Sequence, residues 1–478
     1  MMEERTLEFM RKAADGKILM GSGETIVKEI FTDSRAPVPG GAFLAVCGDR
    51  FDGHDFIEST AQTGCRVFIV SRTEGIHFPE GSSILCVKDT TLAYGQIAAA
   101  YRNDFPGLKV IAVCGSNGKT TTKDLIAAVL AKKGKVLSNL KSFNNHIGVP
   151  QTLLQITSDH QYAVVEVGTN HPGELVPLLK WIAPTHGVLT SIGNEHLEFF
   201  KNVDGVVAEE GTLAESLLEN GVLFINADSY GYETICGRLN PKARKISIGC
   251  KTANADWIGR LLGISCQGTT FEIFHKAKEM GGFHGDIHVK TWQVRPLGAH
   301  QVTNALLAIA VARELGVPEN DIADALRECP PSDMRAQVRS VNGMTLLVDC
   351  YNANLDSVYA ALETLRSLQP ETGGKRVAIL GTMGELGETA CEVHKKVAHR
   401  AAVSGVDIAL FCGQYADEMK AVFEREGQTP SDAKSFDTLE SLLKEVDSNV
   451  SNGDCVLIKA SRAQRFEKIV ERLEGKKL

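Results

Sequence analysis

The sequence predicts an α/β protein that is divided into three domains in series. The chain has 478 residues, and a single hydrophobic core rarely serves more than about 250–300 residues. Short apolar runs alternate with helical stretches along the chain, which is typical of mainly parallel sheets covered by helices. The segment Cys329-Pro330-Pro331-Ser332 is typical of a linker. We therefore expect three α/β domains.

The first predicted domain, residues 1–106, is small. Apolar runs at Val67–Val70 and Ile84–Val87 predict strands, and glycine-rich turns lie between the runs of this region. Residues 92–103 predict a helix that closes the region. This part is expected to be a small α/β domain.

The second and third predicted domains are residues 107–332 and 333–478. Their buried-strand runs are 110–114, 162–167, 187–192 and 222–225 in the second, and 345–348, 376–380, 407–411 and 455–459 in the third. Helices are predicted at 120–132 and 304–315. We expect a mostly parallel central sheet and a C-terminal, Rossmann-like, doubly wound sheet.

Composition excludes several classes of function. Lys and Arg number 51 and Asp and Glu 59, which gives a net charge of −8 and argues against a nucleic-acid-binding stripe or a polybasic membrane patch. The 12 cysteines have no zinc-like spacing, and the charged N-terminus and the lack of a long apolar run give no sign of a secretory signal or a membrane helix. We expect reduced thiols in a cytoplasmic monomer that acts on small molecules.

A phosphate-binding loop lies between the first central strand and its helix. The sequence is Gly115-Ser116-Asn117-Gly118-Lys119-Thr120, where glycines let backbone N–H groups face a phosphate at a helix N-terminus. Lys119 would contact the β- and γ-phosphates, the Thr120 hydroxyl would bind Mg²⁺, and Thr121 follows at the same end. The alternative is a glycine turn that only begins a helix. The loop predicts a P-loop-type ATPase domain without saying which reaction it serves.

From this loop onward the chain resembles the Mur ligase family, the ATP-dependent amino-acid and peptide ligases of peptidoglycan synthesis. Similar segments occur in order along the chain: 144–150, Glu166 with 170–174, 193–198, 349–354, 381–387 and 459–462. The Asp349-Cys350-Tyr351-Asn352-Ala353-Asn354 segment and the two after it are similar to the member that adds D-alanyl-D-alanine to UDP-N-acetylmuramoyl-tripeptide.

The resemblance implies an acyl-phosphate mechanism with ATP and Mg²⁺ as cofactors. It assigns catalytic roles to Lys119, Glu166, His196 and Arg335, and Mg²⁺ binding to Thr120, Glu166 and His196. Asn304 would contact adenine, Asp349 the ribose and Arg335 the γ-phosphate. The first domain would hold the UDP-muramoyl-peptide and the third would close with the dipeptide. The implied substrate residues are Ser34, Arg35, Asn144, Asn145, Asn170, Asn352, Lys459, Ser461 and Arg462.

Simpler interpretations of several residues stay open at this point. Asn304 at a helix start would also serve as an N-cap, and Glu166 at a strand end would also reach solvent. His196 alone would as often be a structural histidine as a ligand. Asp33-Ser34-Arg35 would equally form a turn.

The chain departs from the family at one expected metal ligand. Family members carry a carbamylated lysine on the helix after the histidine segment, and Glu210 stands at that position here. We hypothesise that the Glu210 carboxylate binds the second Mg²⁺ directly. The alternative is that Glu209 and Glu210 are solvated helix residues.

Other functions compete with this interpretation. The ligase that adds the third amino acid and folylpolyglutamate synthetase share the architecture, and a nucleotide-gated binding module would need only the phosphate loop. The segments at 349–354 and 381–387 favour the D-alanyl-D-alanine adder. The sequence leaves open whether lysine or diaminopimelate is third in the peptide.

Overall fold

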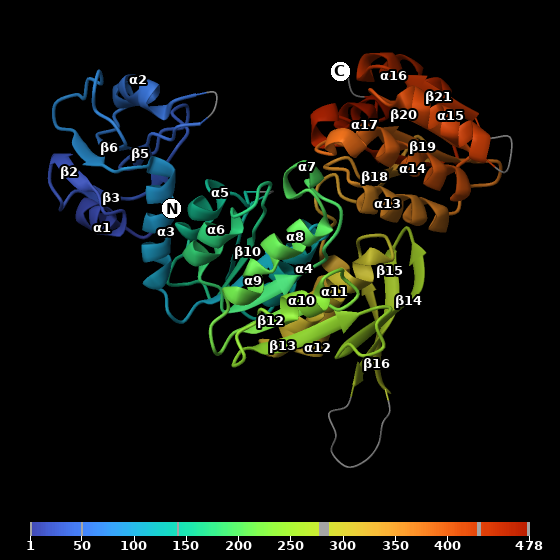
Figure 1. The fold of residues 1–478 in the computed structure, drawn as a ribbon, viewed down its shortest axis with the longest axis horizontal. Helices are drawn as coiled ribbons and strands as arrows, with labels where there is room; N and C mark the ends of the chain where they lie inside the picture. The colour runs from blue at the N-terminus through green and yellow to red at the C-terminus, as the bar shows by residue number, and fades with distance from the viewer. Residues whose placement is uncertain (1, 49–50, 141–142, 277–285, 428–431, 476–478) are drawn as a thin grey trace, which may run out of the picture.

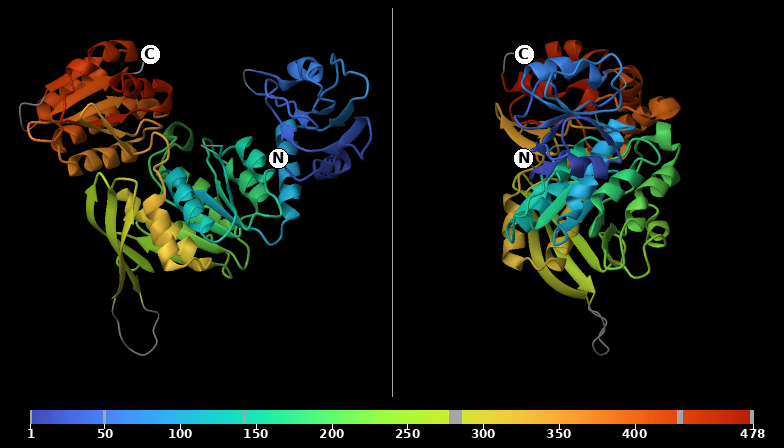
Figure 2. Two further views of the ribbon diagram at one scale, coloured as in Figure 1. Left: turned by 180° about the vertical axis from the view of Figure 1, so that it is seen from behind. Right: turned by 90° about the vertical axis from the view of Figure 1, so that its left-hand side faces the viewer.

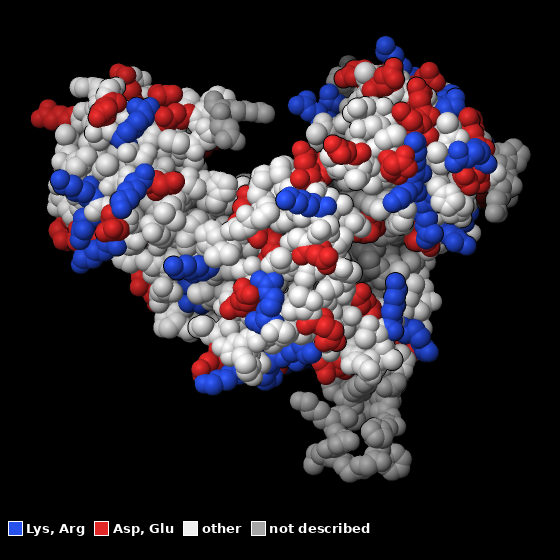
Figure 3. Space-filling model, viewed as in Figure 1, with Lys and Arg blue, Asp and Glu red and all other residues white. Residues whose placement is uncertain are grey.

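The computed structural model describes residues 2–48, 51–140, 143–276, 286–427 and 432–475. Three lobes are evident (Figure 1), each built on its own sheet. Both outer lobes stand on the same side of the central lobe (Figures 1 and 2), and an open notch separates them in Figure 3. Among the described residues, no helix combines the length and apolar character that a membrane span requires.

The N-terminal lobe contains a five-stranded sheet in the order β2-β7-β6-β5-β4. Its strands are β2 (Lys17–Met20), β4 (Ile30–Phe31), β5 (Ala42–Leu44), β6 (Val67–Val70) and β7 (Ser83–Cys86), with a separate pair β1 (Arg5–Thr6) and β3 (Ile26–Val27). Its helices are α1 (Leu7–Ala13), the 3₁₀ turn η1 (Gly53–Phe56), α2 (Ile57–Gln62) and α3 (Thr90–Asn103). Only β2 runs antiparallel to its neighbour in this sheet.

Helix α3 joins this lobe to the central one. It packs on the central helices α5 (Gly148–Leu153) and α6 (Leu175–Ile182). The Tyr101 hydroxyl donates to the Ile156 carbonyl at 2.6 Å, and the Arg102 guanidinium donates to the Ile182 carbonyl at 3.0 Å. Both side chains are buried, and one apolar core runs from the N-terminal sheet to the near face of the central sheet.

The central lobe contains a nine-stranded sheet in the order β16-β15-β14-β13-β12-β11-β8-β10-β9. Its strands are β8 (Lys109–Cys114), β9 (Val136–Ser138), β10 (Tyr162–Glu166), β11 (His186–Leu189), β12 (Val222–Asn226), β13 (Arg244–Gly249), β14 (Trp257–Ser265), β15 (Gly268–Lys276) and β16 (Asp286–Val294). Its remaining helices are α4 (Lys119–Ala131), α7 (Leu197–Phe200), α8 (Val203–Glu210), α9 (Thr212–Glu215), α10 (Tyr232–Cys236), α11 (His300–Glu314) and α12 (Glu319–Glu328). Pairing is parallel from β9 to β14 and antiparallel from β14 to β16.

The C-terminal lobe contains a six-stranded sheet in the order β17-β18-β22-β19-β20-β21. Its strands are β17 (Gln337–Val341), β18 (Met344–Val348), β19 (Arg376–Gly381), β20 (Ile408–Cys412), β21 (Asp432–Phe436) and β22 (Cys455–Lys459). The helical segments are α13 (Leu355–Ser367), η2 (Gly387–Thr389), α14 (Ala390–Val403), α15 (Ala416–Glu426), α16 (Leu439–Glu445), η3 (Val446–Ser448), η4 (Arg462–Gln464) and α17 (Glu467–Leu473). Only the edge strand β17 is antiparallel, and separate apolar cores cover the two faces.

The predicted α/β class with mostly parallel sheets is confirmed. Strands β9, β13, β17 and β21 were not predicted, and two further details differ from the expectation. The antiparallel extension β14–β16 was not predicted, because its strands are partly exposed and lack the continuous apolar runs of the parallel ones. Helix α11 begins at His300, so Asn304 lies in its second turn and the N-cap interpretation of Asn304 is wrong.

Candidate active site

The phosphate loop has the backbone form that the sequence predicts. Gly115 and Gly118 have φ angles of 120° and 86°, values that side chains with a Cβ rarely adopt. The loop is held by the chain that follows β11: the Ser116 amide donates to the Ser191 carbonyl at 2.6 Å, and the Ser191 hydroxyl accepts from the Asn117 amide at 3.2 Å. Helix α4 then begins at Lys119. The loop is therefore rigidly positioned at a helix N-terminus, where phosphates bind well.

Lys119 lies at the centre of the site. Its ammonium donates to the carbonyls of Gly115 and Ser116, the latter at 3.3 Å, and its Nζ is 3.6 Å from Glu195 Oε2. Burial lowers the pKa of Lys119, but the nearby charges of Glu195, Glu210 and Glu166 outweigh that effect and leave the pKa raised. A lysine in these surroundings stays charged, as phosphate binding requires.

Glu166 ends strand β10 and is buried, so the interpretation of a solvated strand-end carboxylate is wrong. Asn139 pairs with its backbone on both sides, and the Asn144 amide donates to Glu166 Oε1 at 2.9 Å. The second oxygen, Oε2, has no hydrogen-bond partner. A buried carboxylate oxygen without a partner is costly unless a cation completes it.

Glu210 and Glu209 are also buried, so the interpretation of solvated helix residues is wrong for both. Glu209 accepts hydrogen bonds from the amides of Gly173 and Leu175 at 2.7 and 2.8 Å, which fixes the loop that follows β10. Both Glu210 oxygens lack a partner. Burial raises the pKa of Glu210 to about 8, although the Lys119 ammonium opposes this rise. In the absence of a cation, Glu210 therefore resists ionisation.

His196 faces the C-terminal lobe. Its φ of 48° is left-handed, and its Nδ1 pairs with the Glu385 carboxylate from the loop after β19. The hydrogen bond to His196 lowers the pKa of Glu385. Sequence reasoning did not select Glu385 or Glu195 individually, although each lies inside a segment that resembles the family.

These residues fit a divalent cation by one structural criterion. Buried oxygens without hydrogen-bond partners occur on Thr120, Glu166, Glu195 and Glu210. Across the described chain, however, Glu166, His196 and Glu210 do not form a compact group with all ligand atoms within 4.8 Å of one another. Mg²⁺ often keeps several waters and takes only one or two protein carboxylates together with phosphate oxygens. These residues are therefore better placed to bind Mg²⁺ together with phosphate oxygens and water than to enclose an ion entirely with protein ligands.

Asn304 and Arg335 approach the phosphate loop from two directions. A Cβ on Gly118 would lie 2.5 Å from Asn304 Oδ1, so this asparagine lies directly against the loop. The Asn304 amide donates to Gln301 Oε1 at 2.9 Å. The Arg335 guanidinium stacks 4.3 Å from the Tyr351 ring centre, and its charge reaches Lys119, where it tends to lower the lysine pKa.

Several residues that the resemblance assigns to ribose or substrate binding lie at the carboxyl ends of strands β18 and β22 in the C-terminal sheet. Lys459 is buried, and its ammonium donates to Asp349 Oδ2 at 2.6 Å and to the Asn352 carbonyl at 3.0 Å. The Ser461 hydroxyl accepts from the Gly384 amide at 2.9 Å, and Arg462 pairs with Glu467 at 3.3 Å. Lys459 therefore organises the 349–354 segment, and its contact with substrate stays a prediction.

The C-terminal lobe also contacts the phosphate loop directly. The Asn354 amide donates to Asn117 Oδ1 at 3.0 Å. Asp356, at the start of α13, accepts from the Asn194 amide at 2.9 Å. The phosphate loop and the start of α13 thus meet at one junction between the lobes.

Asn145 and Asn170 make local contacts instead. Asn145 Oδ1 accepts a hydrogen bond from the Gly148 amide, and the Asn170 amide donates to Glu174.

In the N-terminal lobe, Asp33-Ser34-Arg35 forms a turn. The Asp33 carboxylate accepts from the Arg35 amide and guanidinium at 3.0 and 2.8 Å, and the Arg35 side chain is 88% exposed. Arg35 is therefore accessible to an anionic ligand, and Ser34 is half-buried beside it. A substrate role for either residue stays a prediction.

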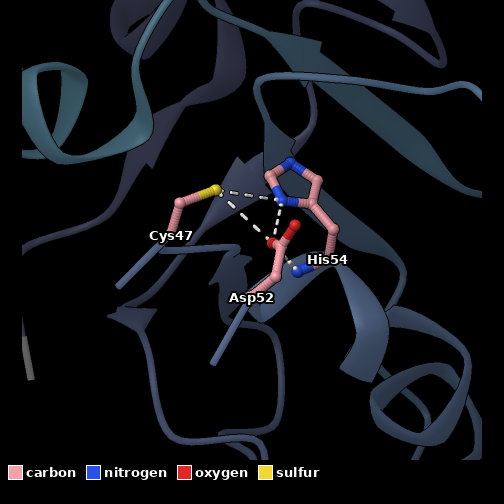
Figure 4. Close-up of side chains that lie close together, drawn as sticks. All are labelled: Cys47, Asp52 and His54. Carbon is pink, nitrogen blue, oxygen red and sulfur yellow. Dashed lines mark hydrogen bonds and ion pairs between the residues drawn. The ribbon is translucent and has the colours of Figure 1, made fainter. Parts of the chain in front are cut away.

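Cys47, Asp52 and His54 form the compact group of metal-capable side chains found among the described residues (Figure 4). The Ser71 amide donates to His54 Nε2 at 3.0 Å, so Nδ1 carries the proton and donates to Asp52 Oδ1 at 2.6 Å. Burial raises the pKa of the Cys47 thiol. A cation at this place would need a free lone pair on His54 Nδ1 and a thiolate on Cys47. Because Nδ1 carries a proton and the raised pKa keeps Cys47 a thiol, we interpret the group as a structural hydrogen-bond network.

Comparison with known proteins agrees with this geometry. Three family models match: the Mur ligase family, catalytic domain over residues 26–110, the Mur ligase middle domain over 113–312, and the Mur ligase, glutamate ligase domain over 334–462. The UDP-N-acetylmuramoyl-tripeptide--D-alanyl-D-alanine ligase of Escherichia coli (strain K12) is 32% identical, over 98% of each chain. The chain belongs to the Mur ligase family.

Further Mur ligases are similar over the whole chain. The Bacillus subtilis (strain 168) protein of the same name is 31% identical over 99% of each chain. A crystal structure of MurF from Acinetobacter baumannii has a TM-score of 0.87 and 28% identity, covering 99% of this chain and 100% of its own.

Proposed function

We propose that this Mur ligase joins D-alanyl-D-alanine to UDP-N-acetylmuramoyl-tripeptide in peptidoglycan synthesis. The reaction is an ATP-dependent acid–amino-acid ligation, and its product is the UDP-muramoyl-pentapeptide with ADP and phosphate. The similarity to relatives of this name over nearly the whole chain supports the assignment. ATP supplies the leaving group by converting the tripeptide carboxylate into an acyl phosphate, which the dipeptide amine displaces.

One structural observation carries the proposal: the phosphate loop contacts the C-terminal lobe next to a second cluster of polar residues. The hydrogen bond from Asn354 to Asn117 joins the C-terminal lobe to the loop that binds phosphates. A simple nucleotide switch has no use for the polar cluster of Asp349, Asn352 and Lys459 at this junction. A ligase needs it, because a nucleotide and an amine substrate must meet there.

We assign the following roles to the chain's own groups. Lys119 and the loop amides hold the phosphates, and Arg335 adds positive charge opposite them. Asn304 would contact adenine, and Asp349 would bind a ribose hydroxyl. Mg²⁺ supplies charge neutralisation when it is bound by Thr120, Glu166, His196 and Glu210. His196 would bind the ion through Nε2 while its Nδ1 stays paired with Glu385.

The domain division 1–106, 107–332 and 333–478 belongs to the same proposal. The first domain would hold the UDP-muramoyl-peptide through Ser34 and Arg35, and Asn144, Asn145 and Asn170 would face that peptide from the central domain. The third would bind the dipeptide through Asn352, Lys459, Ser461 and Arg462. The enzyme would be a cytoplasmic monomer whose partners are small molecules, without nucleic acid or membrane.

Phosphate release by the purified enzyme tests the function. Turnover should require ATP, Mg²⁺, UDP-N-acetylmuramoyl-tripeptide and D-alanyl-D-alanine together. Turnover that is indifferent to both peptides would refute the ligase and favour a stand-alone ATPase. Turnover with single amino acids would favour the third-residue ligase or a folylpolyglutamate-type enzyme. Product mass with lysine or diaminopimelate tripeptides identifies the natural substrate.

Lys119→Ala should lower kcat for phosphate release by at least about 100-fold, because removing one buried transition-state donor typically costs this much. The matched control is Lys133→Ala, just beyond the far end of the same helix, where the lysine contacts the Leu315 carbonyl. Retained turnover in Lys119→Ala would show that the loop has been misread.

A further inference from the structure

Glu195 is a buried glutamate with one carboxylate oxygen that has no hydrogen-bond partner. It lies between β11 and α7, one residue before His196, and is 8% exposed. Its Oε2 is 3.6 Å from Lys119 Nζ, at the centre of the site. Its Oε1 is buried and has no hydrogen-bond partner. One oxygen of Glu195 therefore pairs with the Lys119 ammonium, and the other has no partner.

Three buried carboxylates surround Lys119. Glu166, Glu195 and Glu210 are all buried and all act electrostatically on this one ammonium. Each of them also carries at least one oxygen without a partner. Buried carboxylate oxygens without a hydrogen-bond partner are strongly unfavourable unless a cation completes them. A divalent cation beside these three residues would satisfy the unpaired oxygens.

We propose that Glu195 is a third carboxylate of the divalent-cation site, binding the ion through Oε1 directly or through one coordinated water. The proposal rests on the proposed function, which requires Mg²⁺ at this place. The oxygen chemistry suits a hard cation such as Mg²⁺ or Mn²⁺. A role as counter-ion of Lys119 alone would use Oε2 and give no reason for burying Oε1 unpaired.

The test uses the full-length, nucleotide-free protein and Mn²⁺ as the probe, with binding followed by electron paramagnetic resonance. Glu195→Gln keeps the shape and removes the charge, and it should weaken Mn²⁺ binding by about tenfold or more, within the range seen when groups supporting a metal site are removed. Glu198→Gln, an exposed glutamate three residues away, is the control and should bind as wild type. Unchanged Mn²⁺ affinity in Glu195→Gln would overturn the proposal.

Two further measurements separate the competing explanations. ATP binding in EDTA reports on Lys119 without a cation, so a variant that changes only this affinity would identify Glu195 as a counter-ion and overturn the proposal. Glu195→Asp keeps the charge and should bind Mn²⁺ more tightly than Glu195→Gln, and equal loss would also overturn it.

The variant Glu166→Gln shows whether a negative result affects only the assignment of Glu195 or the cation site of the proposed function as well. If Glu166→Gln weakens Mn²⁺ binding and Glu195→Gln does not, only the assignment of Glu195 fails. If neither variant affects Mn²⁺ binding, the cation site of the proposed function is itself misplaced. Raised apparent unfolding temperatures on adding Mg²⁺, smaller in Glu195→Gln than in wild type, would support the proposal independently.

Discussion

Backbone strain at single residues marks the junction of the central and C-terminal lobes. His196 and Glu385, whose side chains are in contact, have left-handed φ angles of 48° and 58°. Met334 and Ala336, on either side of Arg335, have φ angles of 52° and 46°. Each such residue costs on the order of 1 kcal/mol, and strain of this kind concentrates at ligand-binding sites. The surrounding structure therefore places these side chains against the local preference of the chain.

At the residue scale, Glu210 gives the first prediction. Glu210→Gln removes the charge that would bind the cation, so the Mg²⁺ concentration for half-maximal phosphate release should rise about tenfold. Glu233→Gln, an exposed glutamate in α10, should leave it unchanged. The measurement is an Mg²⁺ titration of steady-state activity. Unaltered activity and Mg²⁺ dependence in a Glu210 variant would remove this residue from the metal set.

His186 gives a pH-dependent prediction. Burial lowers its pKa to about 4, while the unfolded chain titrates near 6.5. The unfolded state therefore binds the proton first as the pH falls, and stability is lost between pH 6.5 and 4 by up to about 3 kcal/mol. In His186→Gln the apparent unfolding temperature should fall less over this range. Exposed His77→Gln should retain the wild-type pH dependence, and equal slopes in all three proteins would contradict the prediction.

Local sequence predicted only part of the site. The phosphate loop follows from a short-range pattern, because a strand, a glycine turn and a helix adjoin in the chain, whereas the role of Glu166 came from the resemblance to the family. The pairing of Lys119 with Glu195 and of His196 with Glu385 depends on contacts across 76 and 189 positions. No local pattern encodes such contacts.

At the element scale, the central parallel strands were predictable because they are buried on both faces and read as continuous apolar runs, whereas the parallel strands β9, β13 and β21 are only partly buried and were not predicted. Strand β10, for example, is buried at every position. Strand β14 is mostly half-buried or exposed, and Gly259, Arg260 and Gly263 interrupt its apolar residues, so it lacks a continuous apolar run. The start of α11 was missed because His300 and Gln301 are polar and lie inside the helix.

Helix α3 gives the prediction at this scale. A Cβ on Gly95 would lie 2.1 Å from Trp181 Cε2, so the helix approaches the central lobe where only glycine fits. Gly95→Ala gains about 1 kcal/mol of helix propensity, but displacing a buried ring costs about 1–3 kcal/mol, so the variant should be less stable. Gly107→Ala, where no atom lies within 4 Å of the added Cβ, should change stability by less than about 0.5 kcal/mol. Thermal unfolding measures both, and a stabilised Gly95→Ala would contradict the packing argument.

At the scale of the whole molecule, the two outer lobes are attached differently. The N-terminal lobe shares a continuous apolar core with the central lobe. The C-terminal lobe has its own cores, one of which also includes Leu297 of the central lobe, and it meets the central lobe through polar contacts such as Asp356 with Asn194 at 2.9 Å and Asn354 with Asn117 at 3.0 Å. Polar junctions open at a lower free energy than apolar ones, so the C-terminal lobe is the part expected to move during turnover.

Asp356 tests this expectation. Its carboxylate accepts the Asn194 amide, and a Cβ on Gly193 would lie 2.4 Å from Asp356 Oδ2, so the two lobes fit closely there. A hydrogen bond to a charged group contributes about 1.5–3 kcal/mol, and Asp356→Ala should therefore speed hydrogen exchange at the Asn194 amide by at least about tenfold. Asp417→Ala, at an exposed position in α15, should not change it. If exchange at Asn194 were equally slow in both variants, the junction would be held by contacts other than this carboxylate, and the C-terminal lobe would not open there.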